Sequence, residues 1–88
     1  MAKSFNLSII TPDKIAYEGK AVSLVVPAAL GYLGVLADHR PLIANVVSGK
    51  ITLTEESGKT LTFHYKDKGF LEVLKNNVTL LLNSANIS

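Results

Sequence analysis

The chain has 88 residues and no cysteine, so it is one domain that neither a disulfide nor a thiolate metal site can stabilise. Its formal charge of +2 comes from nine scattered lysines and arginines against seven acidic residues. Because the basic residues are scattered, they do not predict the concentrated basic face of a nucleic-acid binder. The N-terminus lacks the apolar core of a signal peptide, and no apolar run approaches the ~20 residues that span a bilayer. Membrane association is therefore expected only through a partner.

The chain reads as a succession of short strands. Phe5, Leu7 and Ile9 alternate with polar residues at the start, and Leu61, Phe63 and Tyr65 do the same further on, as half-buried strands do. Strands recurring every eight to twelve residues between turns predict an all-β sandwich or barrel, and we favour a two-sheet β-sandwich formed by residues 1–88 as a single domain. The predicted strands cover residues 4–10, 15–17, 21–26, 31–36, 41–47, 50–55, 60–66, 70–75 and 78–83.

Two turns are predicted with particular residues. Residues 18–20 should bend the chain between two short strands, the second of which places Val22, Leu24 and Val26 on one face. Gly31 permits a tight bend, because glycine tolerates positive φ. A turn should follow over residues 37–40, where Pro41 pushes the preceding residue toward extended conformations.

The last two strands are apolar on both sides. Phe70 and Leu71 are adjacent, and Leu80, Leu81 and Leu82 follow one another. A strand of this kind must bury both of its faces. The alternatives are a partner that covers the second face, or an ordinary sandwich with a few exposed leucines. The pattern alone leaves both open.

Residues that could carry bond chemistry are few. His39 and His64 have no second histidine or cysteine at ligand spacing, so no metal site is expected. Asp38 and His39 could form a base with its orienting carboxylate, but no nucleophile motif accompanies them. A histidine that holds the turn or contacts a partner is the favoured interpretation. We therefore expect no catalysis and no cofactor.

Several separated blocks resemble the signature of the epsilon subunit of rotary ATP synthases. Their spacing also agrees, and the resemblance runs from about Phe5 to Ala85. Two features depart from the family: Ala37-Asp38 stands where Pro-Gly is common, and the chain ends at Ser88, where the family usually continues into a helical hairpin. The matching blocks are Gly31-x-Leu33-Gly34-Val35, His39-x-Pro41-Leu42, Gly49-x-Ile51, Gly69-Phe70-Leu71-Glu72-Val73 and Asn77-Val78-Thr79.

The resemblance implies a fold, a function and partners. It implies a flattened sandwich of about ten strands that acts as a non-catalytic rotor subunit of the central stalk. One surface would dock on the gamma subunit, and one end would sit on the membrane c-ring. The isolated chain would be a monomer, and the complex would lie on the cytoplasmic face of a bacterial plasma membrane, with the thylakoid as the alternative. If residue 88 is the natural end, no inhibitory tail is expected.

The resemblance and the surplus of apolar positions suggest where those partners would bind. The c-ring interface is predicted at Ala29, Tyr32, His39 and Arg40, and the gamma interface at Thr11, Ala44, Val46 and Leu81. The rival hypotheses are a free-standing ligand-binding module of OB-like or carbohydrate-binding type, which would need exposed aromatic residues on one face, and a small enzyme that uses Asp38 and His39.

Overall fold

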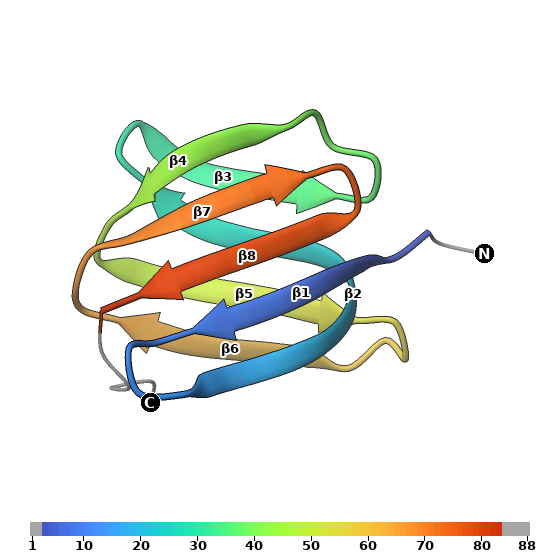
Figure 1. Ribbon diagram of the computed structural model, residues 1–88, viewed down its shortest axis with the longest axis horizontal. Helices are drawn as coiled ribbons and strands as arrows, with labels where there is room; N and C mark the ends of the chain where they lie inside the picture. The colour runs from blue at the N-terminus through green and yellow to red at the C-terminus, as the bar shows by residue number, and fades with distance from the viewer. Residues whose placement is uncertain (1–2, 84–88) are drawn as a thin grey trace.

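The computed structural model describes residues 3–83, and within them every regular element is a β-strand (Figure 1). This confirms the all-β class. The eight strands are β1 (Phe5–Ile10), β2 (Ile15–Ala28), β3 (Gly31–Leu36), β4 (Leu42–Val46), β5 (Gly49–Glu55), β6 (Thr60–Tyr65), β7 (Gly69–Leu74) and β8 (Asn77–Leu82).

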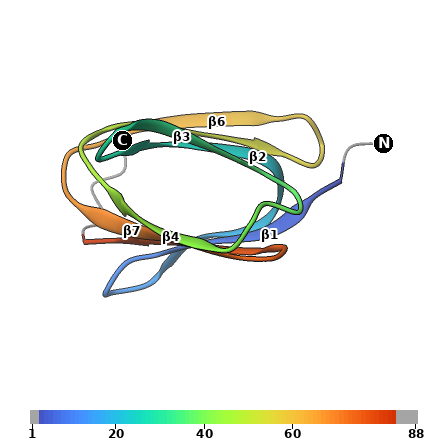
Figure 2. The ribbon, with the colours of Figure 1, turned by 90° about the horizontal axis from the view of Figure 1, so that it is seen from above.

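The strands form two layers that are joined through β2 (Figure 2). The first layer runs β4, β7, β8, β1 and the first half of β2, with β1 and β8 parallel and its other pairs antiparallel. The second layer runs β3, the second half of β2, β5 and β6. One strand thus serves both layers, and hydrogen bonding is continuous around that side of the sandwich.

The predicted break at residues 18–20 is wrong, because β2 continues through it. Glu18 pairs with Ser8, and Lys20 pairs with Asn6, so this segment is part of the ladder with β1. The register against β5 shifts between Ala21 and Ser23, as at a β-bulge. The shift buries Ala21 and leaves Val22 half-buried, although Val22 was predicted to share the buried face with Leu24. Because β2 is continuous, eight strands are present where about ten were expected.

The core lies between the two layers and consists of the inward side chains of both. The alternation predicted for β1 and β6 is confirmed, since Phe5, Leu7, Ile9, Phe63 and Tyr65 are all buried. The other buried apolar side chains are Ala21, Leu24, Val26, Val35, Val46, Ile51, Leu53, Leu71, Val73, Val78, Leu80 and Leu82.

In strands β7 and β8, which are apolar on both sides, alternate side chains face the core and the outside of the first layer. Leu71 and Leu80 face the core, whereas Phe70, Leu74 and Leu81 remain exposed on the outside of the first layer. The second apolar set that the sequence showed is therefore left uncovered by the described residues.

A cluster of hydrogen bonds holds the β3–β4 turn against the β7–β8 turn. Asp38 adopts the left-handed conformation with φ 63°, at a position where the related signature often has glycine. Its backbone N–H donates to Asn76 Oδ1 at 2.8 Å, and Asn76 Nδ2 donates to its carboxylate at 3.2 Å. Lys3 Nζ donates to the same carboxylate at 3.0 Å. The β7–β8 turn comprises Lys75 and Asn76, one residue earlier than predicted.

The core assignment predicts a sharp contrast between two leucines of β7. Leu71 is fully buried, and Leu74 is 53% exposed. Leu71→Ala should lower the free energy of unfolding by about 2–5 kcal/mol, because it removes core contacts and leaves a cavity. Leu74→Ala, the matched control, should lower it by less than about 1 kcal/mol. Urea unfolding measures both, and equal losses would contradict the assignment of the two faces.

The turn cluster predicts a pH-dependent contribution from Asp38. The hydrogen bonds from Lys3 and Asn76 lower the pKa of the Asp38 carboxyl below its ordinary 3.8. A lowered folded-state pKa stabilises the fold above the unfolded-state pKa, and this stability is lost as the pH falls through the folded-state pKa. Asp38→Asn should therefore reduce the Tm near neutral pH, and the difference from wild type should shrink in acid. Lys3→Gln should reduce the same difference. A pH-independent difference would contradict the role of the charge.

Candidate interaction surfaces

The described residues offer little for bond chemistry. In residues 3–83, no group of three His, Cys, Asp or Glu side chains could hold a metal ion. The Asp38 carboxylate binds Lys3 and Asn76, while His39 Nδ1 is 2.7 Å from the Arg40 carbonyl oxygen, to which it would donate. Asp38 thus does not orient the His39 ring, so the two residues do not form a general base with its orienting carboxylate. The described part of the chain also contains no helix of the length and apolarity needed to cross a bilayer.

A row of apolar side chains crosses the outside of the first layer. Phe70 of β7 pairs with Leu81 of β8, Leu81 pairs with Ile10 of β1, and Ile10 pairs with Ile15 of β2. Ile43 of β4 lies on the same side, in the neighbouring cross-strand row, and is 73% exposed. We call these five residues the apolar outer face. Phe70 and Leu81, which are 53% and 43% exposed, also line a shallow pocket with Pro12.

The predicted gamma-interface residues are divided between this face and the interior. Leu81 belongs to the apolar outer face. Val46 is 1% exposed, and Ala44 is half-buried against the core. Thr11 is also buried, and its hydroxyl donates to the Lys14 carbonyl oxygen at 3.2 Å. The side chains of Val46 and Thr11 therefore belong to the fold, and only Leu81 of the four presents an exposed apolar side chain.

The register of β4 explains this result. Side chains alternate along a strand, so inward Ala44 and Val46 place Ile43 and Asn45 outside. Almost every position from 42 to 47 is apolar, which hides the register in the sequence. Asn45 was the available signal, because a lone polar residue in an apolar strand marks the face toward water. Because the register of β4 was hidden, Ile43 was not predicted as part of an interface.

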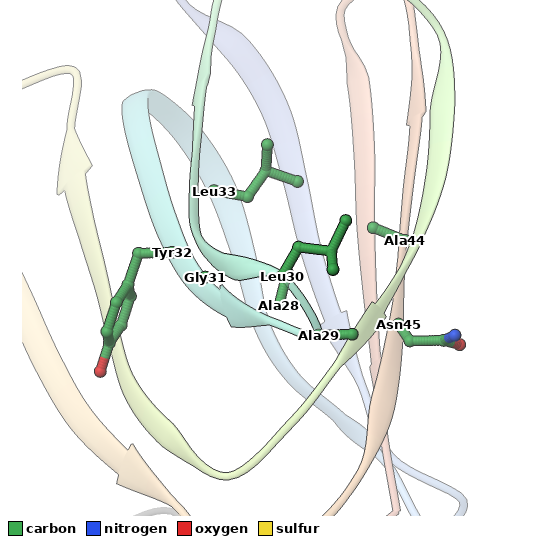
Figure 3. A pocket seen from close by; sticks show the side chains of 8 residues that line it. All are labelled: Ala28, Ala29, Leu30, Gly31, Tyr32, Leu33, Ala44 and Asn45. Atoms are coloured by element: carbon green, nitrogen blue, oxygen red, sulfur yellow. The ribbon is translucent and has the colours of Figure 1, made fainter.

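The β2–β3 turn projects apolar and aromatic groups at one end of the sandwich (Figure 3). Leu30 is fully exposed, and Tyr32 is 62% exposed. Tyr32 is one of the residues that line a pocket with Leu30, Leu33 and Ala44, although in Figure 3 its ring points away from those three side chains. The Tyr32 hydroxyl accepts a hydrogen bond from the Lys50 backbone N–H at 3.3 Å. Tyr32 is thus held against the start of β5, although most of its ring meets solvent.

The predicted c-ring residues do not lie together. Ala29 lies in the turn before β3 and Tyr32 at the start of β3, whereas His39 and Arg40 belong to the turn after it (Figure 1). A six-residue strand spans about 17–20 Å, so the two turns lie at opposite ends of β3. If one end of the sandwich binds the c-ring, the interface can contain Ala29 and Tyr32 or His39 and Arg40, but not both pairs. Ala29 and Arg40 are exposed, and His39 is half-buried.

The outside of the second layer has a different character. Thr54 and Thr60 pair across β5 and β6, as do Thr52 and Thr62, with hydroxyl oxygens 3.3 and 3.5 Å apart. The most exposed aromatic residues, Tyr32 and Phe70, belong to different layers, so no single face presents the aromatic platform that a carbohydrate-binding or OB-like module uses. The apolar outer face and the hydroxyl-rich face thus distinguish the two sides of the sandwich.

Curated relatives share most of this chain. It is 36% identical over 86 residues to an ATP synthase epsilon chain from Natranaerobius thermophilus, covering 98% of this chain and 61% of the relative. It is 39% identical over 80 residues to one from Leptospira borgpetersenii, covering 91% and 61%. A chloroplastic epsilon chain from Emiliania huxleyi is 38% identical over 82 residues, covering 93% and 62%. The chain thus spans about three fifths of the length of these relatives.

Solved structures share the fold. A chain in the Euglena gracilis mitochondrial ATP synthase matches with a TM-score of 0.86 at 20% identity, covering 96% of this chain and 53% of that chain. A chain in the Tetrahymena thermophila mitochondrial ATP synthase central stalk and c-ring matches with a TM-score of 0.74 at 12% identity, covering 93% and 65%. The family model described as the β-sandwich domain of the ATP synthase delta/epsilon chain matches residues 4–87. The chain therefore belongs to the ATP synthase delta/epsilon chain β-sandwich family.

Proposed function

We propose that this chain is a non-catalytic subunit of the ATP synthase central stalk, in which its sandwich connects the gamma subunit to the c-ring. Family membership over residues 4–87 supports the proposal that the chain is part of an ATP synthase complex. The observation that carries the docking role is the apolar outer face, a solvent-exposed row that crosses several strands. A face of this kind on a small soluble domain is typical of a protein interface.

Gamma would bind the apolar outer face. Stable interfaces bury ~800 Å² on each partner and take most of their energy from a few apolar or aromatic residues near the centre. Phe70 and Leu81 lie side by side at such a centre, with Ile10 and Ile15 continuing the row and Ile43 beside it. This placement keeps Leu81 from the sequence prediction and replaces inward Ala44 and Val46 with Ile43.

The c-ring would bind the end that carries the β2–β3 turn. Leu30 has no cover, and Tyr32 is anchored to the Lys50 backbone, so the turn presents apolar surface in a fixed position. The opposite end is less suited, because Asp38 and Asn76 are already bound to each other there. Ala29 and Tyr32 stay in the proposed ring interface, whereas His39 and Arg40 leave it.

The mechanism would be mechanical. Torque from the ring would pass through the sandwich to gamma and so to the catalytic head. Close-packed interiors deform little, and β2 ties the two layers together, so the domain suits the transmission of force. The chain would supply no catalytic group or cofactor. It would lie at the membrane through the complex, on the cytoplasmic face of a bacterial plasma membrane, with the thylakoid as the alternative that the chloroplastic relative from Emiliania huxleyi suggests.

A charge on the apolar outer face should weaken gamma binding. Leu81→Lys should reduce affinity for the gamma subunit by about tenfold or more, because a lysine at the centre of an apolar interface loses its hydration. Val25→Lys is the matched control, since Val25 is 36% exposed on the outside of the second layer. Calorimetric titration with gamma measures both, and circular dichroism checks folding. Equal affinities for the two folded variants would refute this placement.

The two ends of β3 can be separated by crosslinking. The chain has no cysteine, so Leu30→Cys and Arg40→Cys each introduce a single thiol. In the assembled complex, a c-ring with one cysteine in its polar loop should form a disulfide with the Leu30 variant. The Arg40 variant should remain unlinked, because it lies at the far end of β3. Crosslinking of Arg40→Cys alone would reverse the orientation.

A further inference from the structure

The outer edge of β6 is open. This strand ends the second layer, and among the described residues its only ladder is with β5. It runs from Thr60 to Tyr65 without proline, acidic residue, lysine or bulge. Natural sheets usually protect an edge with one of these features, because an unprotected edge pairs with other chains. On the opposite edge, β3 is interrupted by Gly34, so the two edges of the layer differ.

Within residues 3–83, the hydrogen-bond pattern shows which backbone groups of β6 its ladder with β5 leaves free. Glu55 N–H donates to the Lys59 carbonyl oxygen at 2.7 Å, which makes these two residues a hydrogen-bonded pair. Such pairs alternate along an antiparallel ladder. Leu61, Phe63 and Tyr65 therefore direct their backbone groups to β5. The backbone groups of Thr60, Thr62 and His64 point away from it, toward the open edge.

Below this edge, half-buried apolar side chains border a groove between the two layers. The groove is lined by Ala16 and Tyr17 of β2 and by Leu61 and Phe63 of β6. Tyr17 donates from its hydroxyl to the Glu55 carboxylate at 2.7 Å, and burial together with this bond raises its pKa to about 12. A strand added beside β6 would cover the groove and satisfy the free backbone groups.

We propose that β6 pairs with β6 of a second copy of this chain, antiparallel and with a two-fold axis at Thr62. In this register Thr62 faces Thr62 of the second copy, and Thr60 faces His64. All three residues with free backbone groups are then paired within the two strands. On the inner side, Leu61 faces Phe63 of the second copy, which places an apolar pair over the groove. No two like charges face one another in this register.

The association would be weak and independent of the proposed function. A six-residue edge covers less than the ~800 Å² per partner of a standard stable interface. We expect a Kd near ~1 mM, the range in which small contacts bind. The added strand extends the second layer from β6, so the apolar outer face of the first layer stays free.

The two-fold register gives a charge-swap test. Thr62→Lys alone and Thr62→Asp alone should each associate up to about fivefold more weakly than wild type, because identical charges would face one another. An equal mixture of the two should associate more tightly than wild type, since opposite charges then meet. Thr62→Ala, which keeps the backbone, should remain close to wild type. Sedimentation and NMR diffusion of the 88-residue chain up to about 2 mM measure the association.

Three outcomes would overturn the proposal. The first is a wild-type chain that stays monomeric at the highest concentration. The second is a mixture that associates no better than its components. The third is association that Leu81→Lys abolishes, which would place the contact on the apolar outer face. If the wild type stays monomeric and both charged variants fail to join the ATP synthase complex, the edge accepts a strand of another chain instead.

Discussion

The membership of β2 in both layers is the constraint on which the rest of the structure depends. Its first half pairs with β1, and its second half lies between β3 and β5. The register shift between Ala21 and Ser23 lets the strand change layers and still bury side chains in the shared core. Because β1, β3 and β5 all pair with this strand, its register determines which of their side chains face the core. The same register determines which side chains lie outside.

The two outer faces follow from that register and have different chemistry. The first layer leaves Phe70 and Leu81 outside, whereas the second leaves paired threonines together with Val25 and Leu36. The one salt bridge found in residues 3–83 joins Lys3 and Asp38 at the turn cluster rather than on either face. An apolar outer face on one layer and a projecting turn at one end would let the domain contact two partners at once, as the proposed connector role requires.

Much of the fold could be predicted from residues alone, whereas its surfaces could be predicted only in part. Alternation in β1 and β6 identified the buried sides correctly, because polar residues separate the apolar ones. In β4, nearly unbroken apolar sequence left the register undetermined, and Ala44 and Val46 were assigned to a surface although they face the core. The predicted c-ring residues were drawn from both ends of β3, although the strand predicted over residues 31–36 already separates the two pairs. Pairing of β1 with β8 is a long-range contact that no local pattern encodes.

The central claim is that the apolar outer face is covered on assembly, while the hydroxyl-rich face stays in water. Oxidative footprinting of the free chain and of the assembled ATP synthase complex measures both in one experiment. Phe70, Leu81 and Ile43, all exposed in the free chain, should lose most of their reactivity in the complex. Val25 and Leu36, which are exposed on the second layer, should keep theirs. Protection of Val25 and Leu36 with Phe70 and Leu81 unchanged would contradict the account.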